Sequence, residues 1–102
     1  MDLVELLTIG IDRKASDVHL TVGIPPTYRI DGTLVPSVER KLTQEDTLYL
    51  IKQAMDEKKL NKLYETGEID FSYSIPSVGR FRVNAFRQRG SYAMVLRIIP
   101  ME

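Results

Sequence analysis

Cysteine is missing from the 102-residue chain, and histidine occurs once, at His19. The lack of cysteine excludes disulfides and thiolate chemistry, and it is compatible with a reducing, cytosolic setting. No apolar run approaches the roughly 18 residues that a membrane-spanning helix needs. The segment 1–5 also lacks the basic residues of a secretory signal. We therefore expect a cytoplasmic protein that does not insert directly into a membrane.

The common catalytic motifs are missing as well. A lone histidine gives no metal site, because zinc needs about three or four ligands. The sequence contains neither Gly-x-Ser-x-Gly nor the phosphate loop Gly-x-x-x-x-Gly-Lys-Ser/Thr. His19 could be a general base oriented by Asp17, but residues two apart on a strand are poorly placed for that role. A structural histidine is the favoured interpretation, and we assign no catalytic and no metal-binding residue.

Charge is distributed unevenly, although the formal net charge is zero. Residues 71–101 contain five arginines and neither lysine nor acidic residues, whereas residues 1–70 carry an excess of acidic side chains. Arginine pairs with phosphate or carboxylate through two parallel N–H groups, so the arginines could bind an anion. They could equally pair with the acidic helices of the first part. Composition alone leaves both open.

Hydrophobic content of 43% and charged content of 27% are typical of one soluble globular domain. Leu3, Leu6, Leu7 and Ile11 recur at helical spacing, and the period changes to two from residue 68 onward. Thr43 and Asp56 are N-cap candidates for two helices, and Gly67 is expected to end the helix that begins at Asp56. The residues expected to face inward from these two helices are Leu48, Ile51, Met55, Leu60, Leu63 and Tyr64. The patterns predict helices at 2–13, 43–55 and 56–66, and strands at 18–22, 27–30, 33–35, 69–75, 79–86 and 92–99. We expect an α+β domain with helices packed on an antiparallel sheet of about six strands, in an order that the sequence leaves open.

The strand at 79–86 is the most promising binding element. Its alternation places Arg80, Arg82 and Asn84 on one face and the apolar residues on the other. Arg97 lies between Leu96 and Ile98, where an unpaired charge would be costly. It could therefore pair with Asp70 or Glu68 across the sheet, or bind an anion.

Three segments in order carry a family resemblance. They are Ala-Ser-Asp-Val-His-Leu with Pro-Pro and Arg-Ile-Asp-Gly at 15–32, Asp-Phe-Ser-Tyr at 70–73, and Gly-Arg-Phe-Arg-Val-Asn-Ala-Phe with Val-Leu-Arg-Ile-Ile-Pro at 79–100. Together they resemble the N-terminal domain of the PilT-type ATPases that retract type IV pili, within the secretion ATPase superfamily. The likeness spans essentially residues 1–102, with 36–67 matching mainly in pattern.

This resemblance implies a PAS-like domain joined to a RecA-like ATPase core that is absent from this chain. In the family, six subunits form a ring that powers pilus retraction and twitching motility, and each N-terminal domain packs on a neighbouring core. ATP and Mg²⁺ bind in the core, while arginines of the N-terminal domain reach toward the terminal phosphates. The matching positions are Arg82 and Arg97, with Arg80 and Asn84 as weaker candidates.

The resemblance also implies a location at the inner face of the cell membrane, next to the pilus-base machinery. Without a phosphate loop, this chain alone should neither hydrolyse ATP nor bind it tightly. We expect the isolated chain to be monomeric or weakly associated.

Two other interpretations remain open. A stand-alone PAS-like sensor would bind a small molecule in an apolar cavity, near Tyr28, Tyr73, Tyr92 and Met94. A nucleic-acid binder would use Phe81, Phe86 and Tyr92 as stacking platforms, but the neutral net charge argues against nucleic acid as a partner.

Overall fold

A computed structural model describes residues 1–100 as one sheet with three helices. The elements are α1 (Leu3–Asp12), β1 (Asp17–Leu20), β2 (Thr27–Ile30), β3 (Thr33–Pro36), α2 (Gln44–Ala54), α3 (Glu57–Thr66), β4 (Glu68–Ile75), β5 (Gly79–Gln88) and β6 (Ser91–Ile99). The predicted α+β class and the order of elements are confirmed.

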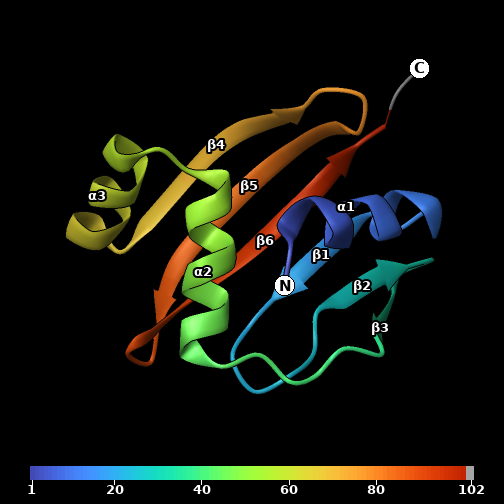
Figure 1. Ribbon diagram of the computed structural model, residues 1–102, viewed down its shortest axis with the longest axis horizontal. Helices are drawn as coiled ribbons and strands as arrows, with labels where there is room; N and C mark the ends of the chain where they lie inside the picture. Colours follow the sequence, from blue (N-terminus) through green and yellow to red (C-terminus); the bar gives the residue numbers. More distant parts are fainter. Residues whose placement is uncertain (101–102) are drawn as a thin grey trace.

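The six strands form one antiparallel sheet in the order β3-β2-β1-β6-β5-β4. Two meanders, β1–β3 and β4–β6, therefore meet where β1 pairs with β6 at the centre of the sheet (Figure 1). Turn signals predict each meander, because tight turns join sequential strands. Turn signals do not predict the pairing of β1 with β6, because these two strands lie almost a full chain length apart in the sequence.

The helices pack on one face of this sheet. In Figure 1, α1 lies over β1 and α2 crosses β5 and β6 on the same side, while α3 packs near the start of β4. The fully buried strand residues, such as Val18, Phe81 and Leu96, point toward these helices and form the core. No helix of residues 1–100 covers the opposite face, which we call the open face.

Local signals set the helix ends as the sequence predicts. Thr43 Oγ1 accepts a hydrogen bond from the Asp46 amide at 3.2 Å, and the Asp46 carboxylate accepts one from the Thr43 amide at 2.8 Å. This reciprocal capping box satisfies two amides at the start of α2. At the end of α3, Gly67 has φ +83°, a left-handed conformation that glycine adopts without steric cost.

The predicted inward stripe of α2 is partly wrong. Leu48 is only half-buried and is not part of the core, whereas Met55 is half-buried and still packs against the core. The buried residues of this helix are Thr47, Leu50, Ile51 and Ala54. Met55 follows the last helical residue with φ −130° and ψ 144°, so it no longer belongs to a helical face.

Two smaller predictions also needed correction. The strand expected at 18–22 spans Asp17–Leu20, because the chain leaves the sheet for a turn at Gly23, whose φ is +95°. Tyr64, expected to face inward, is 37% exposed. Its ring lies at the rim of α3 against Tyr92, with 5.7 Å between the ring centroids.

Tyr28 joins α1 to the sheet in the buried layer. Its hydroxyl donates a hydrogen bond of 2.8 Å to the Leu6 carbonyl. Gly10 of α1 lies directly above the ring, since a β-carbon at position 10 would come within 3.1 Å of Tyr28 Cε1. The helix thus approaches the sheet closely at the point where the hydroxyl bond forms.

We expect Tyr28→Phe to lower the free energy of unfolding by about 1 kcal/mol, because it removes one buried hydrogen bond and keeps the ring. The matched control is Tyr49→Phe, at a tyrosine of α2 that is 59% exposed. Urea unfolding monitored by circular dichroism would compare both variants with the wild type. Equal stability of all three proteins would contradict the role given to the Tyr28 hydroxyl.

Candidate functional site

A line of charged side chains crosses the middle of the open face. In the register of the sheet, Arg29 of β2 lies opposite Asp17 of β1, and Asp17 lies opposite Arg97 of β6. Arg97 in turn lies opposite Arg82 of β5. Directly opposed residues project from the same face of a sheet. Four strands therefore bring three arginines and one carboxylate into a single row.

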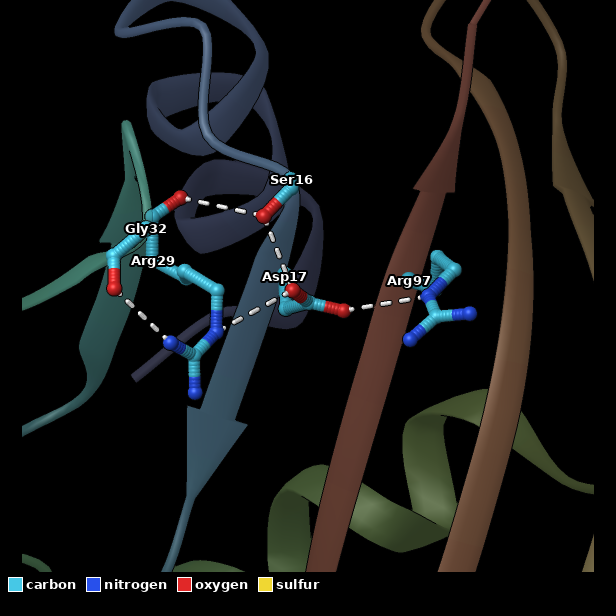
Figure 2. A network of polar contacts seen from close by, with 5 residues as sticks. All are labelled: Ser16, Asp17, Arg29, Gly32 and Arg97. Carbon is cyan, nitrogen blue, oxygen red and sulfur yellow. Dashed lines mark hydrogen bonds and ion pairs between the residues drawn. The ribbon is translucent and has the colours of Figure 1, made fainter.

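Asp17 is at the centre of a polar network, shown in Figure 2. Its Oδ1 accepts a hydrogen bond of 3.3 Å from Arg97 Nε. Its Oδ2 accepts one of 2.8 Å from the Ser16 hydroxyl and forms an ion pair of 3.5 Å with Arg29 Nε. Only 7% of Asp17 is exposed, so both oxygens of this carboxylate are used at the base of the row. Arg29 Nη1 also donates to the Gly32 carbonyl at 3.0 Å, which connects the network to the β2–β3 turn.

The row leaves excess positive charge at the Arg82–Arg97 pair. Like charges directly opposite each other destabilise a sheet. Asp17 offsets part of this repulsion at Arg97, but it also pairs with Arg29. Arg82 forms no ion pair within residues 1–100. An anion between the two guanidinium groups would relieve the repulsion, and phosphate oxygens match their N–H groups.

A hollow of about 210 Å³ contains both arginines. It is lined by Asp17, Asp70, Arg82, Asn84, Val95 and Arg97. The side chain of Arg97 is 75% exposed there, so an anion could approach it from solvent. The structure thus brings together the two residues for which the sequence predicts phosphate contacts.

The two weaker candidates differ in position. Asn84 lines the same hollow, but its amide nitrogen donates to Glu68 Oε2 at 3.0 Å and to Asp70 Oδ1 at 3.2 Å. Arg80 lines a separate hollow beside the β4–β5 turn. The structure therefore groups Asn84, but not Arg80, with the arginine pair.

Arg87 has a structural role instead. Arg87 Nη2 donates to the Tyr64 carbonyl at 2.6 Å near the end of α3, and the guanidinium lies 5.8 Å from the centroid of the Tyr92 ring. A cation at this end of a helix interacts favourably with the helix dipole. Arg87 therefore belongs to a helix end, whereas Arg80, Arg82 and Arg97 lie on the open face.

The pairing of Arg97 with Asp70 or Glu68 is wrong. Both acidic residues belong to β4, which β5 separates from β6, and the partner of Arg97 is Asp17 of β1. Sequence reasoning considered Asp17 only beside His19 and gave Ser16 and Arg29 no role in a site. An acidic residue in a buried strand was the available signal, but only the β1–β6 pairing shows which arginine it binds.

His19 also lies on the open face, between Thr27 and Val95 in the sheet register. It forms no hydrogen bond with Asp17, whose oxygens bind Arg97, Ser16 and Arg29. Its Nε2 is buried and has no hydrogen-bond partner in residues 1–100. The structure therefore does not form the histidine–aspartate pair of a general base.

The structure does not favour the two other interpretations. Tyr28 and Met94 are fully buried core residues. An apolar hollow of about 620 Å³ lies between the end of α1 and the end of β6, and none of these tyrosines lines it. Phe81 is buried under the helices, while Phe86 lies on the opposite face, so no common stacking platform forms.

Within residues 1–100, no helix is long and apolar enough to cross a bilayer.

Comparison with known proteins identifies the relatives of this fold. The chain is 40% identical over 104 residues to the type IV pilus retraction ATPase PilT of Pseudomonas aeruginosa, covering 98% of this chain and 29% of PilT. It is 34% identical over 99 residues to the type IV pilus ATPase PilU of the same organism, covering 97% of this chain and 26% of PilU. The chain is homologous to the N-terminal domain of the PilT-type pilus retraction ATPases. No protein-family model matches the sequence.

Solved structures agree with this assignment. The crystal structure of the pilus retraction motor PilT with bound ADP superposes with a TM-score of 0.92 at 46% identity, covering 100% of this chain and 30% of that one. The structure of the ATPase DotB of Legionella pneumophila gives a TM-score of 0.81 at 26% identity, covering 99% of this chain and 30% of DotB. The chain therefore spans less than a third of the length of these relatives, and it has the fold of the PilT N-terminal domain.

The environment of His19 predicts a pH dependence of stability. Burial lowers the pKa of His19 below its ordinary value of 6.5, and Arg29 acts in the same direction, against the opposing effect of Asp17. The folded chain then binds fewer protons than the unfolded chain, so stability rises with pH. We expect the urea midpoint to fall as the pH is lowered through 6.5 toward 5.5.

His19→Gln should remove most of this slope, because the chain has no other histidine. Urea unfolding at pH 7.5 and 5.5, with the His19 pKa measured by nuclear magnetic resonance, would test this. A His19 pKa above 6.5 in the folded protein would contradict the interpretation.

Proposed function

We propose that residues 1–102 form the N-terminal domain of a hexameric ATPase that powers type IV pilus retraction. In this proposal, Arg82 and Arg97 contact the terminal phosphates of ATP bound in a RecA-like core. Pilus retraction is favoured over secretion by the identities, which are 40% to PilT and 26% to DotB. The ADP in the crystal structure of the PilT motor supports a nucleotide as the ligand.

The cross-strand pair of Arg82 and Arg97 is the observation that carries this proposal. Two arginines lie directly opposite each other on an uncovered sheet surface, and of the two only Arg97 pairs with a carboxylate, that of Asp17. Such a pair is unfavourable for folding by itself. It becomes favourable when a multiply charged anion such as a terminal phosphate lies between the two groups.

The pair also suits a nucleotide sensor. ATP has one more negatively charged phosphoryl group than ADP, at the end of its row of phosphates. Arginines that contact this group gain their interaction in one nucleotide state and lose it in the other, so they bias the closure of the domain on the core. Hydrolysis would in this way be coupled to a movement of the domain.

The described residues fit only part of a nucleotide site. They offer guanidinium donors, but no group of three or more histidine, cysteine or acidic side chains within residues 1–100 could hold a metal ion. Mg²⁺ and the backbone donors around the phosphates therefore belong to the core in this proposal. The core would contribute the hydrolytic residues, and this domain would contribute charge at the far side of the phosphates.

The open face would pack on the core of its own or a neighbouring subunit in the ring. Such packing would cover the arginine row and exclude water from it, which strengthens its electrostatic interactions. We place the assembly in the cytoplasm, peripheral to the inner membrane and in contact with the pilus-base machinery.

We expect Arg82→Ala and Arg97→Ala to lower the ATPase rate of the full-length protein about tenfold or more, equivalent to about 1.4 kcal/mol of transition-state stabilisation. Both side chains are exposed in this domain, so the variants should fold normally. Steady-state phosphate release would give the rate, and circular dichroism would confirm folding.

Arg89→Ala is the matched control. Arg89 lies in the β5–β6 turn and lines neither hollow of the candidate residues. It should retain the wild-type rate. Wild-type rates in Arg82→Ala and Arg97→Ala would overturn the phosphate assignment and leave the two arginines with a structural or interfacial role.

We also expect the isolated 102-residue chain to be a monomer of 11.7 kDa in solution. One face of a small domain buries too little surface for a stable ring, because stable interfaces bury on the order of 1,600 Å² in total. Sedimentation velocity would measure the mass directly. A stable hexamer of this chain alone would contradict the assignment of most ring contacts to the core.

A further inference from the structure

The Asp17 network raises the question of what the carboxylate does for Arg97. It lies at the base of the arginine row, and a carboxylate so close to a proposed phosphate site is unfavourable for anion binding by charge alone. Its presence there needs a compensating function. The geometry of the contact indicates which one.

Asp17 binds Arg97 through Nε only, at 3.3 Å. A carboxylate that neutralises an arginine generally binds two N–H groups in parallel. Here neither Nη group of Arg97 has a hydrogen-bond partner within residues 1–100, and Figure 2 shows one of the two directed away from Asp17. The contact thus restrains the side chain near its base and leaves its outer N–H groups available.

The restraint is rigid because Asp17 itself cannot turn freely. Ser16 Oγ donates to Oδ2 at 2.8 Å, and Arg29 Nε lies 3.5 Å from the same oxygen. Only 10% of the Asp17 side chain is exposed, compared with 75% of the Arg97 side chain. A long, exposed arginine loses considerable rotamer entropy on binding a ligand. A buried carboxylate that orients it beforehand reduces this cost.

We propose that Asp17 is a positioning residue that orients Arg97 toward the terminal phosphate of ATP, an inference that rests on the function proposed above. Ser16 and Arg29 support Asp17 from the opposite side. The network would thereby increase the preference of the site for a nucleoside triphosphate over a diphosphate, because only the triphosphate reaches the oriented Nη groups.

Two simpler roles for Asp17 make opposite predictions. If Asp17 acted only through its charge, neutralising it would strengthen the binding of the more highly charged nucleotide. If Asp17 served only to join β1 to β2, its replacement would weaken both nucleotides equally and would be reproduced by removing Arg29. If Asp17 positions Arg97, its replacement should weaken the binding of the triphosphate selectively, and this effect should require Arg97.

The test measures the affinities of the full-length protein for ADP and for a non-hydrolysable ATP analogue, by calorimetry. The readout is the ratio of the two dissociation constants, which a general loss of structure does not change selectively. Asp17→Asn should lower the preference for the analogue about threefold or more. When Arg97→Ala is already present, adding Asp17→Asn should lower this preference by less than about a further twofold. Arg29→Met removes the longer contact of Asp17 and keeps those to Ser16 and Arg97, so it should lower the preference by less than Asp17→Asn does.

Each other outcome is decisive. An unchanged or increased preference in Asp17→Asn, with a decrease in Arg97→Ala, would overturn the positioning role and leave the phosphate assignment intact. An equal decrease in Arg29→Met would show that Asp17 acts through the sheet edge, and it would overturn the proposal as well. An unchanged ratio in Arg97→Ala would refute the proposed phosphate contact, and the positioning role with it.

Discussion

The pairing of β1 with β6 joins the two meanders into one sheet, and the contact between Asp17 and Arg97 in the candidate site depends on it. Asp17 lies opposite Arg29 within the first meander, and the β1–β6 pairing also places it beside Arg97, so that one carboxylate contacts charges from both meanders. It also aligns Leu96 and Met94 with the core residues Val18 and Leu20 under the helices. The same strand contact therefore builds the core on one face and the arginine row on the other.

The open face illustrates a conflict between stability and binding. A sheet gains most when opposed residues attract each other, and the Arg82–Arg97 pair does the opposite. The buried Asp17 carboxylate reduces this cost at Arg97, and Ser16 and Arg29 hold that carboxylate in place. Residual repulsion at a surface is characteristic of sites whose missing charge is supplied by a ligand.

Much of the fold is predictable because its signals are local. The capping box at Thr43, the left-handed Gly67 and the period-two pattern of β4 and β5 each depend on neighbours within a few residues. The face of α2 was less predictable, because Thr47 rather than Leu48 packs inward once the helix rests on β6. Propensity and periodicity describe an element, while its rotation is decided by what it packs against.

The candidate site was also predictable only in part. Alternation alone puts Arg82 and Asn84 on one face, and the family resemblance selects Arg82 and Arg97. The partner of Arg97 was not predictable, because Asp17 lies 80 residues earlier in the chain. Such a contact follows from strand order, which depends on the total packing of both meanders and has no short sequence signature.

That separation has a consequence for how the chain acquires its structure. Contacts between residues far apart in sequence require closure of a long loop before they contribute free energy, and this slows folding. During synthesis β1 is the first strand of the domain to be made, whereas its neighbour β6 is the last of the six. Until then one edge of β1 and the apolar side chains below it are exposed to other chains. The central strand of the finished sheet is thus an unprotected edge for most of the time that the domain is being made.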